Sequence, residues 1–125
     1  MIDTVAPRIH QLLDRWLAEA PDRPFIHLPD GRSLSFADLG VLTDAAEKEL
    51  RQLGVRAGDR VLVVAENCPE HAALILAASR VGAWSCGVNA RMAPGEVDAF
   101  AAKADARLLY FTASGSRAAA GHARR

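Results

Sequence analysis

The sequence predicts an α/β fold: a parallel βαβαβ sheet with flanking helices, preceded by a small helix and a β-hairpin. The first observation is the run Val-Leu-Val-Val-Ala at 61–65, which does not alternate between apolar and polar residues. Such runs are typical of strands that are buried on both faces of a parallel sheet. The second is that segments with helical spacing separate this run from two further strand-like runs, 83–88 and 107–111. Right-handed crossovers then place all three strands in one sheet.

The N-terminal third predicts a helix followed by a small hairpin. Apolar residues recur at helical spacing over residues 5–19, and two prolines then end the helix. Residues 25–28 read as a short strand, and the turn Pro29–Arg32 contains Asp-Gly, which favours a reversal of the chain. Residues 33–35 then return as the second strand of the hairpin.

The next helix is predicted over residues 35–53. Ser35 is a favoured N-cap residue, and Asp38 lies in the first turn, where a carboxylate suits the helix dipole. Gly54 follows as the expected left-handed stop, since glycine adopts positive φ without steric cost. A tight connector leads from there to Arg60, which introduces the buried strand.

Two crossover helices are predicted after that strand. For the first, we expect Asn67 to be the N-cap, with Glu70 three residues on as in a capping box, and Gly82 to end the helix. The second opens at Pro94 and Glu96. Its expected inward-facing residues are Val97, Phe100, Ala101 and Ala104.

The domain organisation follows from these elements. Residues 1–112 are predicted to form a partial N-terminal α/β subdomain, which is one unit of ordinary size. Residues 113–125 contain no large apolar residue, so we expect a disordered tail in the isolated chain, although their Ala-Ala-Ala segment is compatible with a helix in a longer protein.

Composition excludes several functional classes. Fifteen basic residues balance fifteen acidic ones, so the chain lacks the electrostatic footprint of a protein that binds nucleic acid. The N-terminus lacks the basic and apolar regions of a signal peptide, and no window has the apolar length of a membrane span. Two cysteines, Cys68 and Cys86, do not make a disulfide framework. We therefore expect a cytoplasmic protein.

No complete catalytic motif is present in the sequence. There is no Walker A motif and no Gly-x-Gly-x-x-Gly, and the pair Gly54 and Gly58 precedes a strand, where it cannot present helix amides to a phosphate. Ser85 lacks the upstream glycine of a nucleophile elbow. Cys68 and His71 are spaced to face one point, but a zinc site needs three or four ligands, so we expect neither a catalytic residue nor a metal site.

Asn89 and Arg91 are the polar residues whose position points most clearly to a ligand. They lie past the carboxyl end of a predicted buried strand, the edge at which parallel α/β sheets bind ligands. A structural role is the alternative: Asn89 would fix the loop by hydrogen bonds to the backbone, and Arg91 would be solvated or would pair with Glu96. Both interpretations stay open at this point.

The ordered set of these segments resembles the N-terminal part of the adenylate-forming acyl-CoA synthetases, the AMP-binding enzyme family. The resemblance covers residues 5–112 and resides in an ordered set of short motifs. These are Ser35–Leu39, Gly54–Val55, Gly58–Val61, Glu66–Asn67, Pro69–Glu70, Ala77–Ala83, Val88–Asn89, Arg91 and Glu96. The Asn-x-Arg followed by Glu is more similar to the acyl-CoA ligase branch than to peptide-synthetase modules.

The resemblance implies a two-step reaction for the parent enzyme. A small-molecule carboxylate attacks ATP to give an acyl-adenylate, and coenzyme A then displaces AMP, with Mg²⁺ shielding the phosphates. The family performs this with a Ser/Thr/Gly-rich loop ending in Lys and with further motifs, none of which occurs in these 125 residues. We therefore transfer no catalytic residue, expect no cofactor for the fragment itself, and keep Asn89 and Arg91 as candidates near substrate or coenzyme A.

Two other functional classes stay open. One is a non-catalytic α/β binding module that pairs with a partner chain. The other is a small unrelated enzyme with a Rossmann-like core, against which the missing Gly-rich loop counts. For the fragment itself, strands that need cover on both faces predict exposed edges and self-association.

Overall fold

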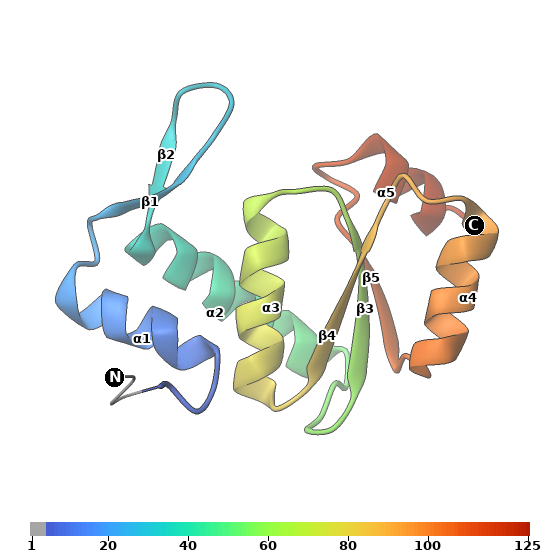
Figure 1. Cartoon of the computed structure of the whole chain (residues 1–125), viewed down its shortest axis with the longest axis horizontal. Coiled ribbons are helices and arrows are strands. Elements are labelled where there is room, and N and C mark those ends of the chain that lie inside the picture. The colour runs from blue at the N-terminus through green and yellow to red at the C-terminus, as the bar shows by residue number, and fades with distance from the viewer. Residues whose placement is uncertain (1–4) are drawn as a thin grey trace.

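The computed structural model describes residues 5–125 as a three-stranded parallel sheet between two layers of helices (Figure 1). Helices α2 and α3 cover one face of the sheet, and α4 and α5 cover the other, while α1 and a hairpin flank α2 and α3. Residues 1–4, on which part of the signal-peptide expectation rests, lie outside the described residues. No helix over 5–125 combines the length and apolarity needed to cross a membrane.

The order of elements is that expected of an α/β chain with a small N-terminal addition. The elements are α1 His10–Glu19, β1 Pro24–His27, β2 Ser33–Ser35, α2 Phe36–Gln52, β3 Arg60–Ala65, α3 Pro69–Val81, β4 Trp84–Asn89, α4 Pro94–Ala104, β5 Leu108–Phe111 and α5 Arg117–Ala123. Strands β1 and β2 pair antiparallel, which confirms the predicted hairpin.

The central sheet has the order β4-β3-β5, with both neighbours parallel to β3. The pairing with β4 runs without interruption from Arg60 opposite Trp84 to Ala65 opposite Asn89. The prediction of one parallel sheet with residues 61–65 as its internal strand is therefore confirmed. β5 differs from the expectation of a fully buried strand, because it is an edge strand and only half-buried.

The non-alternating sequence of β3 is explained by two separate cores. Val61, Val63 and Ala65 pack against α2 and α3 on one face of the sheet. Leu62 and Val64 pack on the other face against α4 and α5. Each residue from 61 to 65 is thus buried, and a polar residue at any of these positions would lose its water without gaining a partner.

Helix α1 is shorter at its start than predicted. It begins at His10, so residues 5–9 precede it. Arg8 fixes this segment: its backbone N–H donates to Gln11 Oε1 at 3.0 Å, and its guanidinium donates to the Ser79 carbonyl oxygen at 2.9 Å. The apolar periodicity over residues 5–19 therefore begins before the first residue of the hydrogen-bonded helix.

The ends of α2 and α3 show which local sequence signals correctly predict where a helix begins or ends. Ser35 caps α2 as predicted, since Ser35 Oγ accepts from Asp38 N at 3.1 Å and Asp38 Oδ2 accepts from Ser35 N at 2.8 Å. Gly54 and Gly82 have φ of +82° and +84°, which confirms both as left-handed stops. The expected cap at Asn67 is wrong: α3 has Cys68 at its N-cap, with no capping bond from the side chain.

Two further expectations differ from the structure. Phe100 does not face inward on α4, since 44% of its surface is exposed, while Val97 on the same helix is fully buried. In place of the disordered tail expected over 113–125, the structure has a turn and helix α5, whose Ala119 is fully buried against α4 and the sheet. The division at residue 112 into subdomain and tail stays a prediction.

Candidate functional site

The topology creates a crevice at the carboxyl ends of β3 and β4. The connection after β3 leads to α3 on one face of the sheet, and the connection after β4 leads to α4 on the other. Neighbouring strands whose connections diverge in this way leave a gap between their ends, and open α/β sheets bind ligands there. The crevice is thus the place in this fold where a ligand site is expected.

An open pocket of about 510 Å³ occupies this crevice. Both predicted site residues, Asn89 and Arg91, lie in its wall. The other lining residues come from the end of β3, the start of α3 and the end of β4: Ala65, Glu66, Asn67, His71, Gly87 and Val88. Two segments that are distant in sequence are therefore brought together around the candidate residues.

Asn89 and Arg91 are held by specific hydrogen bonds. Asn89 Oδ1 accepts from the Arg91 backbone N–H at 2.9 Å, so the asparagine fixes the turn that follows β4. Arg91 Nε donates to Glu66 Oε1 at 2.6 Å, so the expected alternative pairing with Glu96 is wrong. Glu96 instead accepts from the Ala93 backbone N–H at 2.9 Å at the start of α4. Arg91 remains accessible, with 77% of its side chain exposed.

Glu66 is the central charged group of the site, and the sequence reasoning did not select it. Its second oxygen, Oε2, accepts from Ser116 Oγ at 2.6 Å, which connects the crevice to the cap of α5. The Ser116 hydroxyl first, and then the Arg91 guanidinium, hold the pKa of Glu66 below its usual value. The signal that selects Asn89, a polar residue directly after a buried strand, would also have found Glu66.

His71 contributes a neutral group to the pocket, and Cys68 lies at the N-cap of α3 outside the pocket lining. Burial lowers the pKa of His71, so its ring is neutral near pH 7, and burial raises the pKa of the Cys68 thiol, so it stays protonated. The His71 ring lies over Gly87 of β4. Over residues 5–125, no three His, Cys, Asp or Glu side chains are grouped so as to hold a metal ion.

This set of groups is suited to binding rather than to covalent chemistry. The pocket offers amides from Asn67 and Asn89, a neutral imidazole, and a guanidinium whose charge is partly balanced by Glu66. A nucleophilic mechanism needs an accessible hydroxyl or thiol beside a general base. The Cys68 thiol stays protonated, and the Ser116 hydroxyl beside Glu66 is buried and caps α5. The crevice can therefore orient a polar ligand.

Comparison with known proteins assigns this chain to a sequence family. The family model described as AMP-binding enzyme matches residues 13–124. The chain is 38% identical over 90 residues to 4-coumarate–CoA ligase 2 of Oryza sativa subsp. japonica, covering 71% of this chain and 16% of that protein. It is 33% identical over 103 residues to the 3-hydroxybenzoate–CoA/4-hydroxybenzoate–CoA ligase of Thauera aromatica, covering 82% and 20%.

Solved structures show the same fold. The crystal structure of VinN superimposes with a TM-score of 0.78 at 24% identity, covering 85% of this chain and 27% of that one. The anthranilate CoA ligase AuaEII, solved with anthranoyl-AMP, gives 0.76 at 23% identity, covering 85% and 20%. The chain thus spans a fifth or less of the two ligases that it matches in sequence, and about a quarter of VinN.

Proposed function

The chain belongs to the AMP-binding enzyme family, and from this membership we propose that it is the N-terminal part of an ATP-dependent acyl-CoA synthetase. The observation that carries the proposal is the identity of 38% and 33% to two CoA ligases over most of this chain. The fold similarity to VinN and AuaEII agrees with it.

The proposed reaction of the parent enzyme has two steps. A carboxylate oxygen of the acid forms a bond to the α-phosphorus of ATP, and pyrophosphate leaves. The sulfur of coenzyme A then bonds to the acyl carbon, AMP leaves with the carboxylate oxygen, and the thiol proton passes to a base. Both steps need positioning and stabilisation of charge more than covalent participation of the protein.

The role that we assign to residues 1–125 within this enzyme is structural support at the edge of the active site. Mg²⁺ accompanies ATP in the proposed reaction, but the described residues offer no cluster of ligands for it, so we assign it no ligand in this chain. Asn89 and Arg91 are the residues proposed to lie near substrate or coenzyme A, because they line the crevice at the strand ends. The proposed partners are small molecules, namely the carboxylate substrate and coenzyme A. The proposed compartment is the cytoplasm.

The test of activity is ATP–pyrophosphate exchange with the purified 125-residue chain and a panel of carboxylic acids. We expect no exchange above the enzyme-free rate, while a full-length CoA ligase assayed in parallel gives a clear signal. Exchange by the 125-residue chain would overturn the proposal that it is inactive alone. The parentage is tested by sequencing the DNA downstream of the codon for Arg125, where we expect a Ser/Thr/Gly-rich loop that ends in Lys.

A second function is favoured by one observation, the open edge of β4 in the described structure. A non-catalytic binding module would use such an edge to pair with a partner chain. A stable, cooperatively unfolding monomer would favour this alternative. The synthetase fragment is instead expected to self-associate through its strand edges.

A further inference from the structure

The turn that carries Arg91 is fixed at its start by Asn89. Asn89 Oδ1 accepts from the Arg91 backbone N–H at 2.9 Å, and the Asn89 carbonyl oxygen accepts from Met92 N at 3.1 Å. Because Arg91 lines the pocket in the crevice, the path of this turn decides where its guanidinium lies. Two further contacts reach Arg91 and its turn from α5, far along the chain.

The first contact from α5 is a pair of hydrogen bonds that ends on the Arg91 side chain. Ser116 Oγ donates to Glu66 Oε2 at 2.6 Å, and Arg91 Nε donates to Glu66 Oε1 at 2.6 Å. Ser116 Oγ also accepts from Ala119 N at 3.0 Å, so the cap of α5 leaves the single hydroxyl proton for Glu66. Ser116 is only 6% exposed. The cap of α5 and the position of the guanidinium thus depend on the same hydroxyl.

The second contact is made by His122, near the end of α5. Its Nε2 lies 3.0 Å from the Ala90 carbonyl oxygen and 3.2 Å from the Met92 carbonyl oxygen. Carbonyl oxygens only accept hydrogen bonds, so Nε2 carries a hydrogen and donates to both. His122 is 8% exposed and Ala90 is 1% exposed. A buried ring therefore fastens the residues on either side of Arg91.

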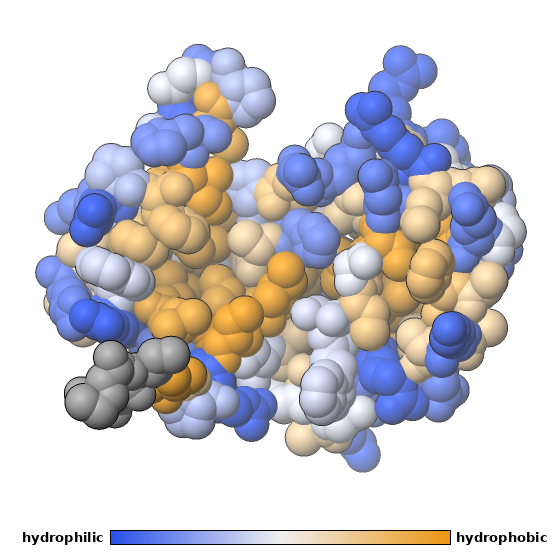
Figure 2. All heavy atoms as spheres, in the orientation of Figure 1, coloured by the Kyte–Doolittle hydropathy of each residue, from blue (hydrophilic) through white to orange (hydrophobic). Residues whose placement is uncertain are grey.

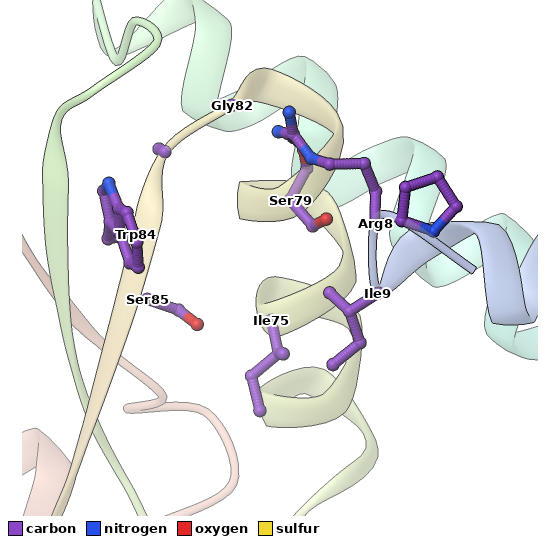
Figure 3. Close-up of a pocket in the computed structure, with 9 residues that line it drawn as sticks. Arg8, Ile9, Ile75, Ser79, Gly82, Trp84 and Ser85 are labelled. Carbon is purple, nitrogen blue, oxygen red and sulfur yellow. Dashed lines mark hydrogen bonds between the residues drawn. The ribbon is translucent and has the colours of Figure 1, made fainter. Parts of the chain in front are cut away.

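The crevice differs from a second pocket, which lies at the other end of β4. That pocket has a volume of about 470 Å³, and Figure 3 shows Ser85 of β4, Ile75 of α3 and Ile9 facing it. Its described lining contains one charged side chain, Arg8, which donates to the Ser79 carbonyl oxygen at 2.9 Å. Figure 2 shows apolar side chains that continue from there over α1 and α3. In the crevice, by contrast, a guanidinium and a carboxylate meet across two strand ends, and a third element fixes the carboxylate.

We propose that α5 is a positioning element of the crevice. Ser116, through Glu66, and His122, through the carbonyl groups of the turn, set the orientation of Arg91. All of these contacts join groups between residues 66 and 122, so they require no surface of the chain to be unoccupied. The ligand that Arg91 meets rests on the proposed function, whereas the orientation of Arg91 does not.

Arg91 needs this support because an arginine side chain is long and flexible. A ligand that binds an unrestrained arginine must offset the entropy that is lost when the side chain becomes ordered. Glu66 removes part of that cost before a ligand arrives, but only if its own carboxylate is held, which Ser116 does. The bond to Glu66 uses Nε alone, so the two terminal nitrogens of Arg91 can donate to a ligand in the crevice.

The experiment follows the Nε–Hε group of Arg91 by nuclear magnetic resonance in the 125-residue chain. Its signal is identified by its absence from the spectrum of Arg91→Lys. A hydrogen-bonded Hε exchanges slowly with water, so the exchange rate measures how firmly Glu66 holds Arg91. In the unmodified chain, we expect this rate to be at least about tenfold lower than in an unstructured peptide, the factor expected for a charge-assisted hydrogen bond.

Variants at position 116 separate positioning from capping. Asparagine and aspartate have the same size and both cap helices well, but only the asparagine amide can donate to Glu66. Ser116→Asn should keep the slow exchange of Arg91 Hε, whereas Ser116→Asp should speed it at least about threefold. Protection of the Ala119 amide shows that α5 stays capped in both. Ser35→Ala removes the cap of α2 and should leave Arg91 Hε unchanged.

Variants at position 122 test the second contact in the same way. Glutamine can donate to the carbonyl groups of Ala90 and Met92, whereas methionine, of similar length, cannot. His122→Met should speed exchange of the Arg91 amide and of Arg91 Hε at least about threefold, and His122→Gln should speed both less. Circular dichroism checks that all variants are folded.

Three results would overturn the inference. These are an Arg91 Hε that exchanges in the unmodified chain as it does in a peptide, equal rates in Ser116→Asn and Ser116→Asp, and equal rates in His122→Gln and His122→Met. Equal rates within a pair would assign that residue to the attachment of α5 alone. The measurement involves no ligand, so failure of the proposed function would change the ligand of the crevice and not these rates.

Discussion

The imidazole ring of His71 lies directly over the α-carbon of Gly87: a Cβ placed at Gly87 would come within 2.9 Å of His71 Nε2. The contact joins the first turn of α3 to the last residues of β4, and it forms one wall of the crevice. Glycine at this position is therefore explained by the ring above it. Its φ lies outside the left-handed region, so its backbone is one that other residues adopt.

Replacement of Gly87 by alanine should stabilise the unmodified chain less than it stabilises a chain that lacks the ring of His71. In the unmodified chain, the new Cβ displaces the ring of His71, and this strain offsets the gain from a less flexible unfolded chain. We expect the free energy of unfolding to change by less than about 1 kcal/mol. In a His71→Ala background the ring is gone, and Gly87→Ala should stabilise by about 0.5–1 kcal/mol. Urea unfolding of the four variants measures this cycle, and equal effects in both backgrounds would refute the contact.

Acid should loosen helix α5 before it unfolds the sheet. Ser116 and Arg91 hold the pKa of Glu66 below 4.5, so this carboxyl binds its proton less readily in the folded chain than in the unfolded chain. Its stabilising contribution is thus complete above about pH 4.5 and is lost as the pH falls through the lower folded pKa. The protection factor of the Ala119 amide, which donates to Ser116 Oγ, should fall in this range.

The control for this prediction separates Glu66 from other carboxylates. Glu66→Gln should remove the acid dependence of Ala119 protection, because the amide cannot titrate. The pKa of Asp30 is also lowered, by Arg32 in the hairpin turn, far from α5. Asp30→Asn should therefore leave the acid dependence of Ala119 unchanged, and a change there would contradict the assignment.

Arg80 should contribute more to stability than the neighbouring surface arginine. Only 16% of its side chain is exposed, and it lies 2.6 Å from Asp44 and 3.4 Å from Glu47, both on α2. We expect Arg80→Ala to lower the free energy of unfolding by about 1.5–3 kcal/mol, as for charged hydrogen bonds that are partly buried. Arg51→Ala, which removes an exposed pair with the same Glu47, should cost at most about 0.5 kcal/mol.

Tyr110 should titrate well above an ordinary phenol. Burial, and then the Glu49 carboxylate that accepts its hydroxyl at 2.8 Å, raise the pKa of Tyr110 to about 12. The chain has one tyrosine, so the near-ultraviolet phenolate band reports this residue alone. Since the fold favours the neutral phenol, the associated stability is present below pH 10 and is lost as the pH rises toward 12.

The variant Glu49→Gln isolates the cause of this shift. It removes the negative charge while keeping an acceptor, so the pKa of Tyr110 should move toward 10. Glu19→Gln, on α1, should leave it unchanged. A phenol that titrates near 10 in the unmodified chain would contradict the contact between β5 and α2.

Much of the fold could be predicted because its decisive signals are local. Burial of β3 on both faces leaves a run of five apolar residues, and the reciprocal cap of Ser35 and Asp38 needs only four consecutive positions. The order β4-β3-β5 is decided by helix packing on the two faces, which no local pattern contains. Helix α5 was missed for the same reason: Ser116 bonds to Glu66, fifty residues away, and His122 bonds to the Ala90 carbonyl oxygen.

The candidate site also combines features that the sequence predicts with features that depend on contacts between distant segments. The rule that ligands lie at the carboxyl ends of parallel strands was sufficient to select Asn89 and Arg91. The partner of Arg91 could not be selected by spacing along one helix, because Glu66 reaches it from the neighbouring strand end rather than from α4. The contact between the His71 ring and Gly87 likewise depends on the register between β3 and β4.

The strand order also determines when the chain can fold during its synthesis. β3 leaves the ribosome before either strand that pairs with it, and its first partner is complete only at Asn89, its second only at Phe111. Until Asn89 is synthesised, the five buried residues of β3 can be covered on one face alone, by α2 and later α3, because α4 begins only at Pro94. A nascent chain of this kind carries its most hydrophobic segment unpaired for more than twenty residues of translation, which is the interval in which a chaperone that binds extended apolar peptide would act on it.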